Sequence, residues 1–319
     1  MITVIIPYYQ KDPGILAKAL ASIALQKPTH LPIHVLVVDD ASPISAESEL
    51  KKLDPINFSL QIVLQKNGGP GAARNTGIEN APVGTRYIAF LDSDDEWSND
   101  HIFRAVKALE SGYKFYFADH YQLNSTVGAF ARAGRIRPDD HPLIPGNVLD
   151  LHAYQGDLLD QIIRGNVIGT STVVYDFLKF SKIRFKAEFT NAGEDYLFWM
   201  DIAASGTKAA FSNQCEAYYG SGVNIYAGTG WGSDNHLLRI HNEIKYKKLI
   251  FKLFKITEPQ RIHINKNLTT LRTSFAKDFL HRIMHRKKLP FDLLKKHLQL
   301  DPLSFLYIPI AIKQAIINN

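Results

Sequence analysis

The stretch RYIAFLDSDDEW, residues 86–97, joins an apolar run directly to a crowded group of acidic side chains. The run RYIAFL predicts a buried strand, because it is short and almost continuously apolar. At its end follow the acids Asp92, Asp94, Asp95 and Glu96, whose like charges repel one another. Such a group indicates either a site for a cation or a solvated acidic loop.

The sequence around this stretch alternates between strand and helix patterns. Apolar runs predict strands at ITVIIP (2–7), IHVLVVDD (33–40) and SLQIVLQ (59–65). Helical spacing of apolar residues predicts helices at PGILAKALASIALQ (13–26) and GAARNTGIENA (71–81). This alternation is typical of an α/β fold in which helices flank a mostly parallel sheet.

Polar residues gather at the carboxyl ends of the predicted strands, where open parallel sheets bind their ligands. The residues at these ends are Pro7, Tyr8 and Tyr9 for the first strand, Asp39 and Asp40 for the second, and Asp92, Asp94 and Asp95 for the fourth. The sequence therefore predicts one binding site along this edge of the sheet.

The pattern changes after residue 113. KFYFADHYQL (114–123) predicts a strand, residues 124–147 predict a hairpin or mobile loop, and residues 151–165 and 194–206 predict helices. Beyond Trp231 the chain becomes basic, with predicted helices at 236–254, around 259–287 and at 293–300. We therefore expect an α/β body followed by a basic helical extension.

Composition and length fit a folded globular protein. The chain has 319 residues and 45% hydrophobic content, enough for one large domain with an appendage or for two domains. The single cysteine, Cys215, excludes an intramolecular disulfide framework and fits a reducing compartment. The N-terminus lacks the basic region of a signal peptide, and no apolar stretch reaches the roughly 18 residues of a spanning helix, so we expect a cytoplasmic protein.

The net charge of +6 is unevenly distributed. Residues 237–319 hold 17 Lys and Arg against 5 Asp and Glu, while residues 1–236 hold 20 against 26. A basic extension fits an anionic partner, either nucleic acid or an anionic membrane surface. Nucleic acid is not favoured, since the sequence has no helix-turn-helix, zinc-finger or aromatic RNP signature.

Three common explanations of the acidic and glycine-rich stretches fail. An EF-hand loop starting at Asp92 would need Gly and Glu at positions that hold Trp97 and Phe103. NGGPGAARN (67–75) lacks the Gly-Lys-Ser/Thr of a P-loop, and Arg74 replaces the third small residue of a dinucleotide fingerprint. A divalent cation bridging a diphosphate fits better, because Mg²⁺ and Mn²⁺ are often held by one or two carboxylates and substrate phosphates.

Five motifs in order resemble those of the family 2 glycosyltransferases, which have the GT-A fold. They are VIIPYYQ (4–10), VVDDAS (37–42), NGGPGAARNTG (67–77), FLDSDDEW (90–97) and GEDYLFW (193–199). The resemblance implies a GT-A catalytic domain at residues 1–220. Within it, residues 1–120 would bind the nucleotide-sugar and residues 121–220 the acceptor.

The resemblance also implies roles for individual residues. Asp195 would be the general base, and Asp94 would bind a Mn²⁺ or Mg²⁺ ion at the donor diphosphate. The nucleotide-sugar would be held by Pro7, Tyr9, Asp39, Asp40, Arg74, Asp92 and Ser93, with Asp40 or Asp39 at the base. Further candidates are Asp95, Glu194, Trp231 and His236, although Glu194 also fits a charge favoured at a helix N-terminus.

The implied activity is a hexosyltransferase reaction. It moves a sugar, with inversion, from a nucleotide-sugar, in the first place a UDP-sugar, to a hydroxyl of a polysaccharide or lipid-linked oligosaccharide. Two alternatives stay open, a non-catalytic nucleotide-sugar or glycan-binding protein and a sugar nucleotidyltransferase. The candidate base Asp195 argues against the first, and PYYQKDPG (7–14) lacks the glycine-rich basic loop that the second would need.

Residues 221–319 are expected to form a flexible glycine-rich loop followed by basic helices. The apolar stripes of these helices would pack on the catalytic domain or on a second subunit in a homo-oligomer. The apolar segment PLSFLYIPIAIKQAII (302–317) follows basic residues at 286–288 and 295–296. This order predicts a peripheral anchor at the inner face of the cell membrane.

Overall fold

The structure of the chain is a computed structural model. It describes residues 1–51, 57–122, 125–146, 150–189, 193–222, 230–233 and 235–317. Residues 314–317 are described by their backbone alone. The chain divides into two compact units. The first unit comprises Met1–Thr190 and Glu194–Val223, and the second comprises Asn191–Gly193 and Asn224–Asn319.

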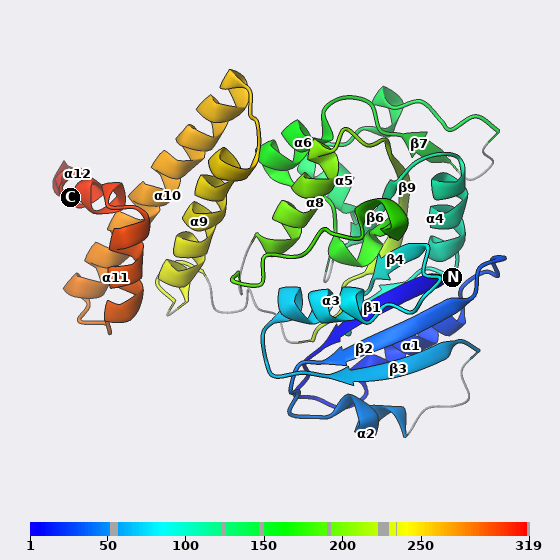
Figure 1. The fold of residues 1–319 in the computed structure, drawn as a ribbon. Helices are drawn as coiled ribbons and strands as arrows, with labels where there is room; N and C mark the ends of the chain where they lie inside the picture. Colours follow the sequence, from blue (N-terminus) through cyan, green and yellow to red (C-terminus); the bar gives the residue numbers. More distant parts are fainter. Residues whose placement is uncertain are drawn as a thin grey trace. The chain divides into compact units, whose positions relative to one another are not determined.

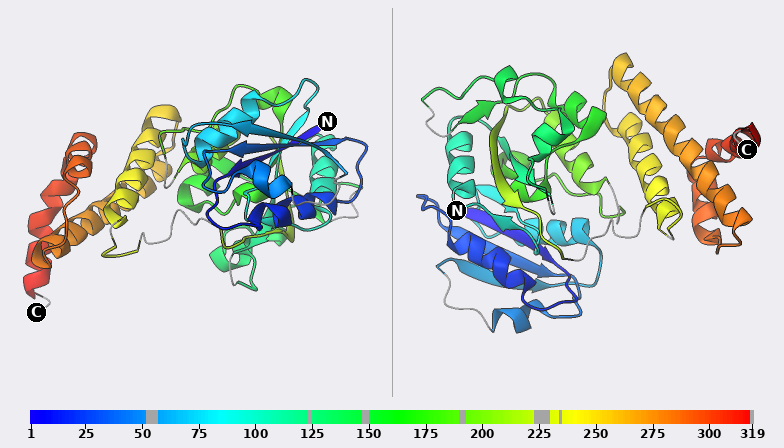
Figure 2. Two further views of the ribbon diagram at one scale, coloured as in Figure 1. Left: turned by 90° about the horizontal axis from the view of Figure 1, so that it is seen from below. Right: turned by 180° about the vertical axis from the view of Figure 1, so that it is seen from behind.

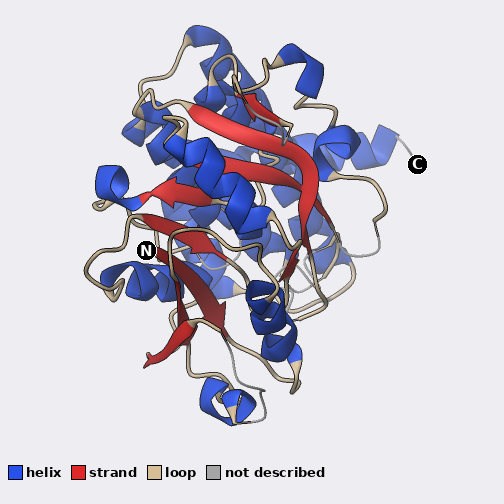
Figure 3. Cartoon of the chain, turned by 90° about the vertical axis from the view of Figure 1, so that its right-hand side faces the viewer, coloured by secondary structure: helices blue, strands red, loops and turns tan. Residues whose placement is uncertain are grey.

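The described part of the first unit contains one nine-stranded sheet (Figures 1 and 3). Its strands are β1 (Ile2–Tyr8), β2 (Ile33–Asp39), β3 (Ser59–Leu64), β4 (Tyr87–Phe90), β5 (Glu96–Trp97), β6 (Phe115–Tyr121), β7 (Leu151–Ala153), β8 (Val174–Asp176) and β9 (Ala209–Tyr218). Their order is β3-β2-β1-β4-β8-β6-β9-β5, and β7 pairs with β9. The longer ladders, β1–β2, β2–β3, β1–β4 and β6–β9, are parallel, whereas the shorter ladders of β5, β7 and β8 are antiparallel.

Helices cover both faces of the sheet. The first unit contains α1 (Ile15–Ala24), α2 (Ala46–Leu50), α3 (Pro70–Glu79), α4 (His101–Glu110), α5 (Ala129–Ala133), α6 (Leu158–Gly165), α7 (Phe177–Phe180) and α8 (Glu194–Ala204), with 3-10 turns η1 (Pro138–Asp140) and η2 (Thr170–Thr172). Figures 1 and 2 show α1 and α3 on opposite faces of the strands β1–β3.

Strand β1 is buried on both faces, and its alternating side chains explain these two layers. Ile2 and Val4 belong to the apolar cluster that also contains Leu16 of α1. Ile5 meets α3 on the other face, where a Cβ at Gly77 would lie 2.4 Å from the Ile5 side chain. A glycine in α3 therefore lets this helix approach the sheet closely.

The carboxyl ends of β1, β2 and β4 lie next to one another. Tyr8 pairs with Asp39 at the end of β2, and Ile5 pairs with Phe90 at the end of β4. The segments that follow these strands therefore meet at one edge of the sheet, as the sequence predicts.

The prediction of one helix at 151–165 was wrong. Leu151–Ala153 forms β7, and α6 begins only after Gly156, whose φ is 102°. Asp157 caps this helix, because its carboxylate accepts the backbone N–H of Asp160 (3.1 Å). The turn residues Gly156 and Asp157 thus outweigh the apolar periodicity of the segment.

The second unit is helical in its described part, so the basic helical extension is confirmed. Its helices are α9 (His236–Leu253), α10 (Glu258–Met284), α11 (Phe291–Leu300) and α12 (Leu303–Ile317). α10 packs against both α9 and α12, and buried Asp301 accepts hydrogen bonds from Arg272 (2.8 Å) and Lys248 (3.0 Å). Among the described residues, no helix combines the length and the apolarity that crossing a membrane requires.

Candidate active site

The acids that follow β4 form a tight turn, residues 92–95, which we call the acidic turn. A hydrogen bond from the Asp95 N–H to the Asp92 carbonyl closes it (3.0 Å). Ser171 of η2 is fully buried; its hydroxyl accepts the Asp92 N–H (3.0 Å) and donates to the Asp95 carboxylate (2.5 Å). These contacts fix the turn against the fold, which is not the arrangement of a solvated acidic loop.

Arg74 joins three segments of the site. Its guanidinium, on α3, lies 2.6 Å from the Asp92 carboxylate and 3.8 Å from the carboxylate of Glu194 on α8. The side chain is only 5% exposed, and the Phe185 ring lies 5.4 Å from the guanidinium carbon. Burial opposes the charge, but Asp92 and Glu194 outweigh it and raise the pKa of Arg74. Arg74 therefore holds the acidic turn and the start of α8 together.

Glu194 and Asp195 open helix α8 beside this guanidinium. Burial raises the pKa of Glu194 to about 7 and that of Asp195 to about 6, and Arg74 counteracts both shifts. The Tyr196 N–H donates to the Asp195 carboxylate (2.8 Å). A carboxylate with a pKa nearer to neutrality takes up a proton more readily than an ordinary one, as a general base requires.

Asp94 and Asp95 have no cationic partner among the described residues. Asp94 accepts the N–H of Gly222 (2.9 Å), and Asp95 accepts the N–H of Gly220 (3.0 Å). Burial, followed by repulsion from Asp92, raises the pKa of both carboxyl groups. When they are ionised, these two carboxylates therefore have no cation beside them in the part of the chain that the structure describes.

Segment 220–222 reaches these carboxylates because two of its residues are glycines. A Cβ at Gly220 would lie 1.7 Å from the carbonyl oxygen of Asp94, and one at Gly222 would lie 2.6 Å from the Asp94 side chain. The expected flexible loop thus begins with residues that are held on the acidic turn. Residues 223–229, which belong to the same expected loop, lie outside the described residues.

Tyr219 belongs to the site although the sequence did not single it out. Its ring stacks on His120 (4.6 Å between centroids, 21° between planes). Gly169 makes room for the hydroxyl, because a Cβ there would lie 2.4 Å from the hydroxyl oxygen. Burial raises the pKa of Tyr219 well above its ordinary value, and three carboxylates of the site raise it further. The hydroxyl is therefore protonated, and it lies within electrostatic range of these acids.

Asp39 and Asp40, the predicted contacts of the base, are both buried and accept backbone N–H groups. Asp39 takes two N–H groups of the turn that follows β2 (2.8 Å each). Asp40 takes those of Gly68 (2.7 Å) and Gly69 (2.8 Å) in the loop before α3. Both carboxylates shape the loops at this edge, and a contact with a nucleotide base stays a prediction.

The other predicted nucleotide contacts differ in their accessibility. Pro7 is buried within β1, and Ser93 is buried where it accepts the side-chain amide of Gln10 (3.0 Å). Tyr9, just beyond β1, is partly exposed, and the Asp92 side chain is 33% exposed. Tyr9 and Asp92 therefore present accessible side chains at the end of the strands, whereas Pro7 and Ser93 support them.

Trp231 and His236 lie in the second unit. His236 is buried, with its Nδ1 atom 3.3 Å from the carboxylate of Asp278 on α10. Trp231 is 55% exposed, and its ring centroid lies 5.4 Å from that of His236. These partners belong to the same unit, and a role of Trp231 and His236 in the reaction stays a prediction.

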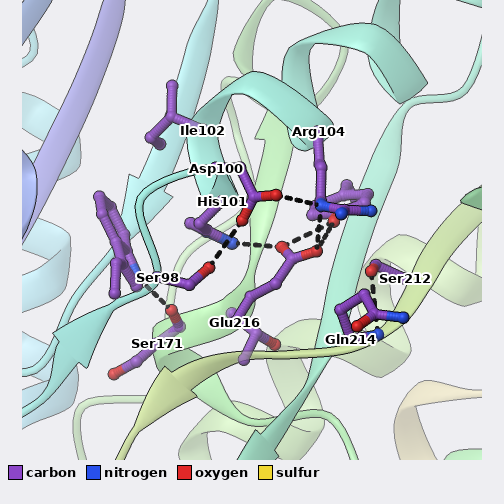
Figure 4. Close-up of polar contacts among 12 residues, drawn as sticks. Ser98, Asp100, His101, Ile102, Arg104, Ser171, Ser212, Gln214 and Glu216 are labelled. Carbon is purple, nitrogen blue, oxygen red and sulfur yellow. Dashed lines mark hydrogen bonds and ion pairs between the residues drawn. The ribbon is translucent and has the colours of Figure 1, made fainter. Parts of the chain in front are cut away.

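A buried polar network holds β9 against α4 (Figure 4). Fully buried Glu216 accepts a hydrogen bond from the Tyr116 hydroxyl (2.8 and 2.9 Å), and its carboxylate lies 2.8 Å from His101 Nδ1 and 3.6 Å from Arg104 Nε. Because β9 leads directly into Gly220, this network supports the backbone that donates to the acidic turn.

The side chains of the acidic turn fit one kind of metal site. Among the described residues, no three or more His, Cys, Asp or Glu side chains gather in a way that could hold a metal ion. The turn offers fewer ligands, namely the carboxylate of Asp94 with those of its neighbours Asp92 and Asp95, and of these only Asp92 has a cationic partner among the described residues. Such a donor set suits Mg²⁺ or Mn²⁺ that takes its remaining ligands from substrate phosphates, and not a cage built by the protein alone.

Comparison with known proteins identifies a family model and relatives that match the chain. The family model described as "Glycosyl transferase family 2" matches residues 3–169. The succinoglycan biosynthesis protein ExoW of Rhizobium meliloti is 32% identical to the chain over 309 residues, which cover 94% of each protein.

Among the solved structures that resemble the fold are two complexes with nucleotide-sugars. Residues 1–349 of TarS from S. aureus in complex with UDP-GlcNAc align with a TM-score of 0.57 and 18% identity, over 98% of this chain and 92% of that one. The mannosyltransferase PcManGT from Pyrobaculum calidifontis, in complex with GDP-Man and Mn²⁺, aligns with a TM-score of 0.56 and 16% identity, over 98% and 84% of the two chains.

Proposed function

The chain belongs to glycosyl transferase family 2, and we propose that it transfers a sugar from a UDP-sugar, with inversion, to a hydroxyl of a surface polysaccharide or lipid-linked oligosaccharide. The predicted GT-A fold and the predicted glycosyltransferase activity are confirmed. The observation that carries the finer proposal is the ion pair of Arg74 with Asp92, because it brings the acidic turn to the helix that starts with Glu194 and Asp195.

In the proposed reaction, the acceptor hydroxyl oxygen attacks the anomeric carbon of the donor sugar. The bond from that carbon to the diphosphate oxygen breaks, and its electron pair leaves with the nucleoside diphosphate. Asp195 takes the proton of the attacking hydroxyl. Attack opposite the leaving group inverts the configuration, so the protein needs no nucleophile of its own.

The raised pKa of Asp195 suits this role. Burial makes the carboxylate a stronger base, and the Arg74 charge keeps its pKa near 6, so that the group is ionised at neutral pH. Arg74 thus acts as a positioning residue: it holds Asp92 toward the donor and the start of α8 toward the acidic turn.

Asp94, with Asp92 or Asp95, would hold a Mn²⁺ or Mg²⁺ ion. Such an ion, when bound, neutralises the charge of the departing diphosphate. The lack of a cationic partner for Asp94 and Asp95 among the described residues supports this part of the proposal, and so does the Mn²⁺ ion of the Pyrobaculum mannosyltransferase.

The proposed substrates follow from the relatives. The TarS complex with UDP-GlcNAc supports a UDP-sugar donor, while the complex with GDP-Man makes GDP the first alternative to test. The relative named for succinoglycan biosynthesis supports a polysaccharide acceptor. We further propose that residues 1–120 bind the donor and residues 121–220 the acceptor, and that the enzyme works at the inner face of the cell membrane.

Calorimetric titration of UDP with and without Mn²⁺ tests the proposal. We expect binding that requires Mn²⁺, that is lost in Asp94→Ala and that is kept in Asp139→Ala, a control at an exposed carboxylate. If the wild type then hydrolyses a UDP-sugar and Asp195→Asn does not, the result contradicts the alternative of a non-catalytic binder. Absence of binding for UDP, GDP and dTDP alike would contradict the proposed donor site.

A further inference from the structure

The turn between α10 and α11 exposes large apolar side chains together with basic ones. Its apolar members are Ile283, Met284 and Phe291, which are 50%, 74% and 74% exposed. Between them stand the exposed basic residues Arg286, Lys287 and Lys288. We call residues 283–291 the basic corner. Grouped exposed apolar side chains mark an interaction surface more often than single ones do.

The backbone of the basic corner is held from behind by buried contacts. Arg282 is 2% exposed and donates to the Asp278 carboxylate (2.8 Å) and to the carbonyl of Lys288 (3.3 Å). Arg286 adopts a φ of 50° just beyond the helix end, a position where glycine is usual. The corner therefore keeps a basic side chain where a glycine would be easier to accommodate.

The outer face of α11 continues the same surface. Phe291, Lys295 and Leu298 are spaced by four and three residues, so they lie on one face of the helix. Leu298 is 50% exposed, whereas its neighbour His297 is fully buried against the Phe275 ring (4.1 Å between centroids). Apolar and basic side chains thus alternate along the exposed side of α11.

We propose that the basic corner and the outer face of α11 dock on an anionic lipid bilayer, with Met284 and Phe291 at the level of the headgroups. Apolar side chains that enter the interface and basic ones that meet lipid phosphates are the two signals that peripheral binding requires. The charge is complementary, since residues 237–319 hold 17 basic against 5 acidic side chains. The inference rests on the membrane location proposed above, but lipid binding is measured without any transfer reaction.

The structure favours this corner over the anchor predicted at residues 302–317. That segment forms α12, which packs on α10 and buries Ser304 and Ala311. Its exposed stripe of Leu303, Leu306 and Ile310 is apolar, and Lys313 is the one basic residue in the helix. α12 therefore supplies the apolar signal without the cluster of charges.

Co-sedimentation of the full chain with vesicles tests the proposal. We expect binding to vesicles of phosphatidylcholine with phosphatidylglycerol and none to phosphatidylcholine alone. Arg286→Gly with Lys288→Ser should lower the partition coefficient about 30-fold, since each basic side chain near the surface contributes about fivefold. Met284→Ser with Phe291→Ser should lower it by at least about tenfold.

Matched controls carry the same changes elsewhere. Lys18→Ser with Lys182→Ser removes two exposed charges, and Val83→Ser with Leu178→Ser removes two exposed apolar side chains (103% and 71% exposed). Both should bind anionic vesicles like the wild type. Arg286→Gly suits the backbone conformation at its position, so this variant should fold.

Four results would overturn the proposal. The first is that the wild type does not bind anionic vesicles. The second is that the corner variants and the controls lose vesicle binding to the same extent. The third is that only Leu306→Ser with Ile310→Ser, in α12, lowers vesicle binding. The fourth is a change of molar mass in light scattering for Met284→Ser with Phe291→Ser while vesicle binding is kept, which would identify a subunit interface. UDP titration of the same variants separates these results from a failure of the proposed activity.

Discussion

Replacing Gly220 by alanine should push segment 220–222 off the acidic turn. The new Cβ would lie 1.7 Å from the carbonyl oxygen of Asp94, whereas real Cβ contacts stay above 3.0 Å. The obstacle is backbone, so no side chain can turn aside, and the segment must move by more than about 1 Å to reach an ordinary contact distance.

A shift of that size breaks two hydrogen bonds to charged groups. They are those from the N–H of Gly220 to Asp95 (3.0 Å) and from the N–H of Gly222 to Asp94 (2.9 Å). Each contributes about 1.5–3 kcal/mol, so the segment loses roughly 3–6 kcal/mol of its attachment. Groups that hold metal ligands in place typically account for 10–100-fold in metal affinity, so Mn²⁺-dependent nucleotide binding should weaken by about that factor.

Calorimetry and thermal unfolding measure both effects. The control is Gly230→Ala, because nothing lies within 4 Å of a Cβ at that position. We expect Gly220→Ala to bind the Mn²⁺–nucleotide pair about 10–100-fold more weakly and to unfold at a lower temperature, and Gly230→Ala to match the wild type. If the two alanine variants bind and unfold alike, segment 220–222 does not hold the acidic turn and the reasoning fails.

Three further predictions concern the buried charges. Asp195→Asn should lower kcat by about 10²–10⁴-fold. Wild-type activity should fall as the pH drops below about 6, because the base must be ionised. A flat pH profile of the activity would contradict this role. Arg74→Met removes the charge that lowers the pKa of Asp195, so the acid limb of the profile should move to higher pH, and a shift to lower pH would refute the assignment. Glu216→Ala removes the carboxylate that the buried Tyr116 hydroxyl and His101 Nδ1 face, so it should cost about 1–3 kcal/mol for each of these two groups in urea unfolding, with exposed Glu96→Ala as a neutral control.

The elements that the sequence predicts well are those buried on both faces. β1, β2 and β4 read as nearly continuous apolar runs, because helices cover both sides of them. β9 was not predicted, since polar residues such as Ser212 and Glu216 interrupt its apolar pattern. The partners that satisfy Glu216 come from α4 and β6, and no local pattern shows them.

α4 is a different kind of omission. Its sequence HIFRAVKALE places Ile102, Ala105, Val106 and Leu109 at helical spacing, so a local signal for this helix is present. The division of residues 151–165 likewise had a signal, because Gly156 and Asp157 form a recognisable helix start.

The candidate site was predictable where a motif carries it. The order of motifs indicates the acidic turn and Asp195, and the structure joins these regions through Arg74. The contribution of Gly220 could not be predicted, because it rests on a contact with Asp95 across 125 positions of the chain. Tyr219 belongs to the same class, since its place depends on the space that Gly169 leaves.

That space has a consequence for how the protein can change over evolutionary time. A Cβ at Gly169 would strike both the Tyr219 hydroxyl (2.4 Å) and the His120 ring (2.9 Å). A lineage can therefore acquire a larger residue at position 169 only after the stacked pair has been replaced or has moved. We expect positions 120, 169 and 219 to be inherited as one set, and homologues that differ at one of them to differ at another as well.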